Sequence, residues 1–170
     1  MRLRTLSPGE MSDDQKGIYA ESTASKRGVV TPPLRAWIHA PEVARHASRL
    51  VAFLRYDTTL GPYYSELAIL VTARTWSAQF EWYAHKKMAL AAGLEPATID
   101  AINHRRTPVF DDAKARLVYD FATTLHRDRK VPDALYREAA ATLGETGVGG
   151  LVGLPGYYTL VSMTPNALEG

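Results

Sequence analysis

Glu81 and His85, two residues suited to proton transfer, lie four positions apart in the sequence. Four residues are about one helical turn, so a helix over this stretch places both side chains on one face. A neighbouring carboxylate can fix the tautomer of an imidazole, which transfers protons near neutral pH. The same spacing is also common on solvated helix surfaces, where such a pair is a weak contact. The spacing therefore leaves a catalytic pair and a surface pair both open.

Three further positions could complete a site around this pair. Glu66 directly precedes the apolar run 67–71, where it either interacts with the dipole of the first helical turn or belongs to a site. Arg74, two turns later, could be its counter-charge or could anchor the carboxylate of a substrate. Ala78 lies one turn before Glu81 on the same face, and its small side chain leaves space for a ligand.

The composition restricts the chemistry. The net charge is only +2 and no dense basic run occurs, so we expect no nucleic-acid partner. The absence of cysteine excludes disulfides, thiolate nucleophiles and cysteine-bound metals. Glu66, Glu81 and His85 could together hold a divalent cation, but the sequence has no strong metal motif, and we expect no metal and no other cofactor.

Helical periodicity runs through every long segment, and no alternating strand pattern occurs, which predicts an all-α fold. We expect Ser7 to cap a first helix, and the connections are short enough for successive helices to pack as antiparallel hairpins. The later predicted helices cover residues 34–38, 41–54, 63–76, 78–92, 95–103, 111–126, 132–144 and 146 to about 165. The length suits a single domain over residues 1–170, with 1–31 as an N-terminal helical extension.

Two segments bear on location and assembly. Residues 146–168 carry no charge, but five glycines and two prolines make a membrane span a poor interpretation. We expect a buried helix or a contact in a homo-oligomer instead, and no membrane partner. Residues 1–16 lack the apolar core of a secretory signal, so we expect a cytoplasmic protein. Among the other histidines, His39 is expected in the core or at the surface, with a place at a cavity entrance as the alternative, whereas His46, His104 and His126 are expected at the surface.

Three sequence blocks, taken in order, resemble the carboxymuconolactone decarboxylase family, which includes the alkylhydroperoxidase D-like proteins. They are the run from Glu66 to Arg74, the motif Glu81-Trp82-x-x-His85, and residues 91–94, which read Ala-Ala-Gly-Leu. The lead-in 33–41 and the tail 156–168 are similar to the family as well. The resemblance covers about residues 32–168.

This resemblance implies an alkylhydroperoxidase D-like bundle of antiparallel helical hairpins that assembles as a homo-oligomer (dimer, trimer or hexamer). In the peroxidase branch, a Cys-x-x-Cys pair precedes a histidine by four residues. Here those cysteine positions fall on Ala78 and Glu81, while His85 and Glu66 match the histidine and the proton-relay glutamate. In the decarboxylase branch the motif reads Glu-Leu-x-x-His, and Trp82 stands in place of the leucine.

The activity that the resemblance implies is that of a carboxymuconolactone decarboxylase-like lyase. Its substrate would be a small carboxylated lactone or a keto-acid-like molecule. His85 would be the general acid/base, Glu81 would orient it and Glu66 would relay protons, while Arg74, Trp82 and Ala78 would contact the substrate. The alternative is a non-catalytic member that binds a small molecule or a protein. Peroxide reduction is not expected without cysteines.

Overall fold

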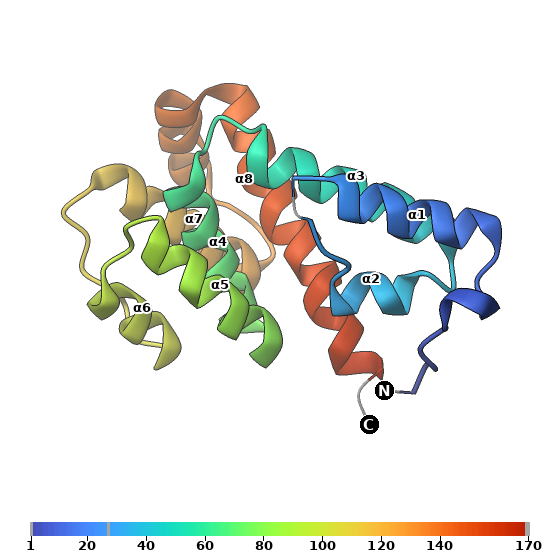
Figure 1. The fold of residues 1–170 in the computed structure, drawn as a ribbon. Coiled ribbons are helices and arrows are strands. Elements are labelled where there is room, and N and C mark those ends of the chain that lie inside the picture. Colours follow the sequence, from blue (N-terminus) through green and yellow to red (C-terminus); the bar gives the residue numbers. More distant parts are fainter. Residues whose placement is uncertain (1, 27, 169–170) are drawn as a thin grey trace.

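The structure, a computed structural model, describes residues 2–26 and 28–168, and these form helices with no strand. The prediction of an all-α fold is therefore confirmed (Figure 1). The elements in chain order are η1 (Pro8–Glu10), α1 (Asp13–Ala24), α2 (Pro32–Trp37), α3 (Pro41–Tyr56), α4 (Pro62–Thr75), α5 (Gln79–Ala91), α6 (Pro96–Asn103), α7 (Ala113–Asp128) and α8 (Asp133–Leu168).

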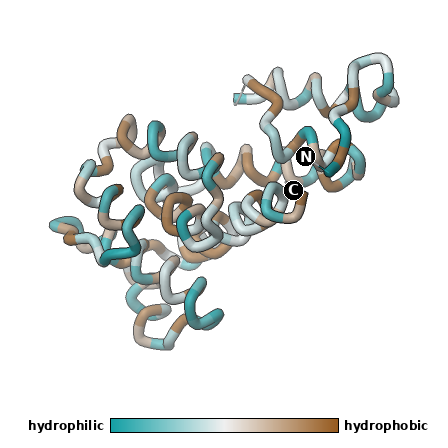
Figure 2. The backbone as a smooth tube through the Cα atoms, turned by 90° about the horizontal axis from the view of Figure 1, so that it is seen from below, coloured by the Kyte–Doolittle hydropathy of each residue, from teal (hydrophilic) through white to brown (hydrophobic). Residues whose placement is uncertain are grey.

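Helix α4 lies at the centre of the bundle. It begins after Gly61, whose positive φ of 79° suits glycine, and Pro62 occupies the first helical position. Its run 67–70 is completely buried, because α5, α7 and α8 pack around it. In Figure 2 hydrophobic stretches of the tube gather toward the middle of the body. A helix that is apolar on every side suits this central place, and it fixes the position of any polar group at its start.

Helix α8 is bent at Gly144, whose φ of 70° is not helical, so the predicted break at this glycine appears as a kink. Beyond the kink, α8 runs between α1–α3 on one side and α4–α7 on the other (Figure 1). Glycines let it approach α3 closely, since a Cβ atom added at Gly153 would lie 3.0 Å from Leu54 Cδ2. Among the described residues, no helix combines the length and the hydropathy that crossing a bilayer requires.

The N-terminal segment packs on α2 and α3 through a second hydrophobic cluster. Ser7 caps only η1, and Ser12 caps α1 by accepting a hydrogen bond from the Gln15 amide at 3.2 Å. The prediction of a helix starting at Ser7 was wrong, because Met11 is extended and ends the first turn. Trp37 contacts both clusters and donates a 2.8 Å hydrogen bond to Thr164 of α8, which ties the segment to the main bundle.

Candidate active site

The start of α4 and the middle of α5 bring Glu66 and His85 together. His85 Nδ1 lies 2.6 Å from Glu66 Oε2. Both side chains are buried, with exposed fractions of 5% and 6%. A contact this short between a carboxylate and an imidazole is a charge-assisted hydrogen bond, which is stronger than a neutral one. Glu66 therefore contacts His85 directly and is more than a partner of the helix dipole.

Arg55, in the last turn of α3, holds the other oxygen of Glu66. Its Nη2 donates to Glu66 Oε1 at 3.1 Å and lies 2.9 Å from Met88 Sδ. Burial acts against the charge of Arg55, but the pKa of Arg55 is raised overall, and the Glu66 carboxylate is a neighbouring charge that favours the guanidinium. Because Glu66 Oε1 accepts from Arg55, its other oxygen, Oε2, is left to accept a hydrogen bond from Nδ1–H of His85. The geometry therefore favours the tautomer of His85 that carries its proton on Nδ1.

The opposite edge of the His85 ring faces Glu81, whose Oε2 lies 3.6 Å from Nε2. The ring of Tyr158 meets the imidazole edge-on at a centroid distance of 4.8 Å. Burial raises the pKa of Tyr158 well above its ordinary value, so its hydroxyl stays protonated. Because the imidazole separates Glu66 from Glu81, their oxygens do not converge on one point. In the described part of the chain, no group of three His, Asp or Glu side chains is arranged to hold a metal ion.

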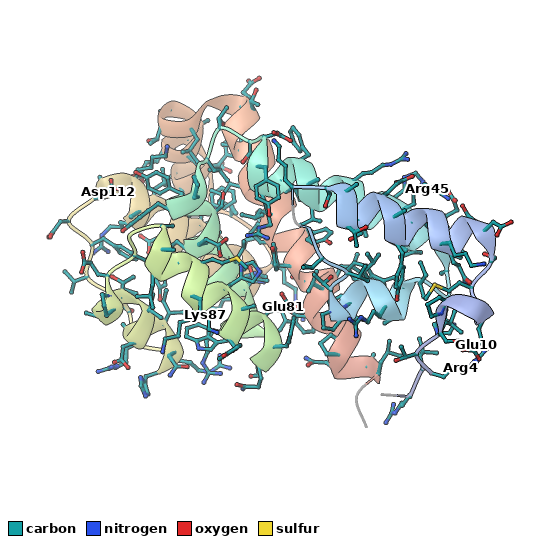
Figure 3. All side chains as sticks on the ribbon, viewed as in Figure 1. Arg4, Glu10, Arg45, Glu81, Lys87 and Asp112 are labelled. Carbon is teal, nitrogen blue, oxygen red and sulfur yellow. The ribbon has the colours of Figure 1, made fainter. Side chains whose placement is uncertain are left out.

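A cavity of about 200 Å³ opens beside this pair. Drug-sized ligands occupy roughly 300–1,000 Å³, so this space suits a smaller molecule. Figure 3 shows Glu81 on the side of α5 that faces α8, where the cavity lies. The lining combines a few polar groups with apolar walls: Val29, Thr31, Pro33, Arg55, Phe80, Glu81, Ala84, His85, Met88, Tyr157, Tyr158 and Val161.

Three of the six predicted site residues meet at this cavity or directly behind it, namely Glu66, Glu81 and His85. Ala78 is buried at the N-cap of α5, where its extended backbone takes it off the helical face, and it does not line the cavity. Trp82 follows Glu81 by one residue and so points about 100° around the helix. It lines a separate cavity between α5 and α6.

Arg74 also lies away from the site. It stands eight residues after Glu66, which is roughly 12 Å along α4. Its Nε donates to the carbonyl of Asn103 at 2.6 Å, at the end of α6. The guanidinium that lines the site cavity is Arg55, which the sequence analysis missed. Arg55 follows the buried Val51 by four residues and so lies on the same face of α3. A charged residue in line with buried apolar residues was the sequence feature that could have indicated it.

One other histidine lies elsewhere than the sequence predicts. His126 was expected at the surface, but it is half-buried, and its Nε2 lies 2.9 Å from Thr72 Oγ1. Burial lowers its pKa. His39 is exposed and its Nε2 lies 2.9 Å from the carbonyl of Arg4, outside the site cavity.

Comparison with known proteins places the fold. No family model matches the sequence, and no curated protein matches it. An uncharacterized peroxidase-related protein from Silicibacter sp. superposes with a TM-score of 0.76 at 18% identity, covering 99% of this chain and 88% of its own. An uncharacterized peroxidase-related protein from Ralstonia eutropha, with an alkylhydroperoxidase AhpD core, gives 0.75 at 18% identity, with 98% and 89% covered. The protein therefore has the alkylhydroperoxidase D-like fold.

Proposed function

We propose that this protein is an acid/base enzyme that acts on a small carboxylated lactone or keto-acid-like molecule, with His85 as the general acid/base. The observation that carries the proposal is the 2.6 Å contact between His85 Nδ1 and Glu66, which leaves Nε2 on the side of Glu81 and the cavity. A buried imidazole held through one nitrogen, with the other beside a cavity, is suited to proton transfer.

The two carboxylates have different parts in this proposal. Glu66 is a positioning residue that keeps the proton on Nδ1, so that Nε2 of the neutral ring can accept a proton. This reverses the sequence-based assignment, in which Glu81 orients the ring, because Glu66 lies 1.0 Å closer, at 2.6 Å against 3.6 Å. Glu81 stands at the cavity edge, where its negative charge stabilises the imidazolium that forms.

Decarboxylation illustrates the proton path. The bond between the carboxylate carbon and the α-carbon breaks, carbon dioxide leaves, and the electron pair passes into the neighbouring carbonyl as an enolate. The protonated His85 then donates from Nε2 to the α-carbon, and the ring becomes neutral. Isomerisation uses the same nitrogen first as base and then as acid. The chain contains no cysteine, so the proposal includes no thiol-based reduction of peroxides.

Arg55 takes the anchoring part that the sequence analysis gave to Arg74. It lines the cavity, and a guanidinium has five donors, of which the contacts to Glu66 and Met88 use Nη2. The remaining donors can bind an anionic group of the substrate. The apolar walls at Pro33 and Phe80 would cover its uncharged part.

The test is a screen of small lactones and β-keto acids against the wild-type protein and His85→Gln. We expect the variant to lose roughly 10²–10⁴-fold of the turnover rate, the usual share of a positioned acid/base group. His46→Gln is the matched control, because His46 is exposed and its Nε2 lies 3.5 Å from Glu42 in a surface pair. Turnover that survives in His85→Gln at the wild-type rate would contradict the proposal. Binding of panel members without turnover would favour the non-catalytic alternative.

We also propose that the protein is a homo-oligomer. The uncharged segment 146–168 leaves Val152, Leu160 and Met163 of α8 between 40% and 48% exposed. Apolar side chains grouped on one helix are typical of a protein contact. Sedimentation equilibrium at micromolar concentration should give a multiple of 18.8 kDa, and a monomer would contradict this proposal.

A further inference from the structure

A second cavity, of about 130 Å³, lies at the far end of α4, away from Glu66 and His85. It is open to solvent and is lined by the C-terminal end of α4, the end of α6 with the residues that follow it, and the middle of α7. Its lining holds three arginines among small, apolar and hydroxyl-bearing side chains: Val71, Arg74, Thr75, Ile102, Arg105, Arg106, Tyr119 and Thr123. None of these residues lines the site cavity, so any role of this place is separate from the proposed acid/base chemistry.

Contacts with the backbone hold two of the arginines in place. Arg74 Nε donates to the carbonyl of Asn103 at 2.6 Å, and Arg105 Nη2 donates to the carbonyl of Arg74 at 3.1 Å. Arg105 also contacts Ser77 Oγ at 3.3 Å. These bonds satisfy carbonyls at the ends of α4 and α6, as cations at helix C-termini commonly do. They use one nitrogen of each guanidinium, so the other donors are left in a fixed arrangement.

The charges around the cavity are unbalanced. Within the described ranges, Arg106 forms an ion pair with Asp100 at 2.5 Å, whereas neither Arg74 nor Arg105 forms one. Two guanidinium groups at one cavity therefore lack a carboxylate counter-charge. Arg105 has a φ of 57° because it follows the end of α6: its amide donates to the Ile102 carbonyl at 3.0 Å, and the Arg106 amide donates to the Ala101 carbonyl at 2.8 Å.

Thr123 supplies an independent observation. It lines the same cavity, and its Oγ1 is buried without a hydrogen-bond partner. A buried hydroxyl without a partner destabilises a fold, and such a group calls for a ligand or a functional reason. Threonine in a helix adopts two χ1 rotamers, and rotation from one to the other moves the hydroxyl to a different position around Cβ. An anion in the cavity could therefore accept a hydrogen bond from this hydroxyl.

We propose that this cavity binds a phosphoryl group, either as inorganic phosphate or as part of a phosphomonoester. Arg74 and Arg105 would contact its oxygens through their remaining donors, and Thr123 would donate its hydroxyl. Guanidinium groups match phosphate oxygens in pairs of parallel hydrogen bonds. Donors that reach the cavity from α4, from α7 and from the segment after α6 suit a tetrahedral anion with several acceptor oxygens better than a planar carboxylate.

The experiment measures thermal unfolding and calorimetric binding of the full chain with inorganic phosphate, methyl phosphate and acetate, at an ionic strength held constant with chloride. We expect phosphate to raise the Tm saturably, and acetate to act no more than chloride. Methyl phosphate binding as tightly as phosphate would identify an ester as the ligand, and weaker binding would identify the free anion. Either result supports the site.

Variants separate a ligand site from a structural cap. Thr123→Val keeps the shape and removes the hydroxyl, so it should raise the Tm of the ligand-free protein and weaken phosphate binding roughly tenfold or more. Ser162→Ala is the matched control, because Ser162 Oγ is also buried without a partner and does not line the cavity. It should leave phosphate affinity unchanged. Arg105→Gln should abolish saturable binding.

Phosphate affinity that is equal in the wild type, Thr123→Val and Arg105→Gln would overturn the proposal, as would a phosphate effect no larger than that of chloride. Neither outcome involves turnover at His85, so the two proposals stand or fall separately.

Discussion

Replacing Glu66 with glutamine tests whether the buried contacts of Glu66 with Arg55 and His85 stabilise the fold strongly. The substitution keeps the size of the side chain and removes its charge. The carboxylate now accepts from Arg55 at 3.1 Å and contacts His85 at 2.6 Å, with an exposed fraction of only 6%. Glutamine can present one oxygen to one of these partners, so either the guanidinium or the ring nitrogen loses its acceptor.

The size of the effect follows from burial. Breaking a buried ion pair by removing one partner costs about 3–5 kcal/mol, because the other charge stays uncompensated. Since glutamine retains one acceptor and part of the packing, we expect the free energy of unfolding to fall by about 2–4 kcal/mol. The matched control is Glu42→Gln. Glu42 pairs with His46 at 3.5 Å and with Arg45 at 3.3 Å, but its own side chain is 72% exposed, so its loss should cost about 1 kcal/mol or less.

Urea denaturation of both variants measures these differences, provided that the m-value stays constant. A double-mutant cycle with His85→Gln adds a stricter check, because residues in direct contact should show a coupling energy of about 0.5–3 kcal/mol. Two results together would refute strong contacts of Glu66 with Arg55 and His85. Glu66→Gln and Glu42→Gln would destabilise the protein equally, and the effects in the double-mutant cycle would be additive.

Three further substitutions test other parts of the fold. Burial lowers the pKa of His126 from its ordinary 6.5, so near this pH the unfolded chain binds more protons than the folded chain. The free energy of unfolding should therefore fall as the pH drops below about 6.5. In His126→Gln, the urea midpoint should depend less on pH. Gly144→Ala places a side chain at a φ of 70° and a ψ of 168°, a region almost exclusive to glycine, which should cost about 1–3 kcal/mol in urea denaturation. Gly153→Ala would bring a Cβ atom within 3.0 Å of Leu54, lowering the Tm, and Leu54→Val in the same chain should restore part of the loss.

The helical fold could be predicted from the sequence because its signals are local. Gly61 and Pro62 start α4, and the apolar run 67–71 can be buried only if helices surround it. The first helix was placed too early because Ser7 and Pro8 form a valid start signal, which the structure uses for a single 3-10 turn. Ser7 and Ser12 both carry the signal of a helix N-cap, so the local sequence alone predicts a helix after either of them.

The residues of the candidate site could be predicted where they share one helix or one motif. Glu81 and His85 lie a turn apart on α5, and the family resemblance added Glu66. Arg55 was missed because it comes from α3, and its proximity to Glu66 depends on packing between helices. Arg74 was misplaced for the same reason, since a position two turns along α4 faces the opposite end of the bundle.

The tautomer of His85 tests the central claim most directly. Long-range ¹H–¹⁵N correlation spectra of the wild-type protein, recorded above the pH at which the ring becomes neutral, report which nitrogen carries the proton. The 2.6 Å contact with Glu66 predicts a protonated Nδ1 and a bare Nε2, and this preference should weaken in Glu66→Gln. A neutral ring protonated on Nε2 in the wild type, unchanged in the variant, would contradict the assignment of His85 as a base oriented by Glu66.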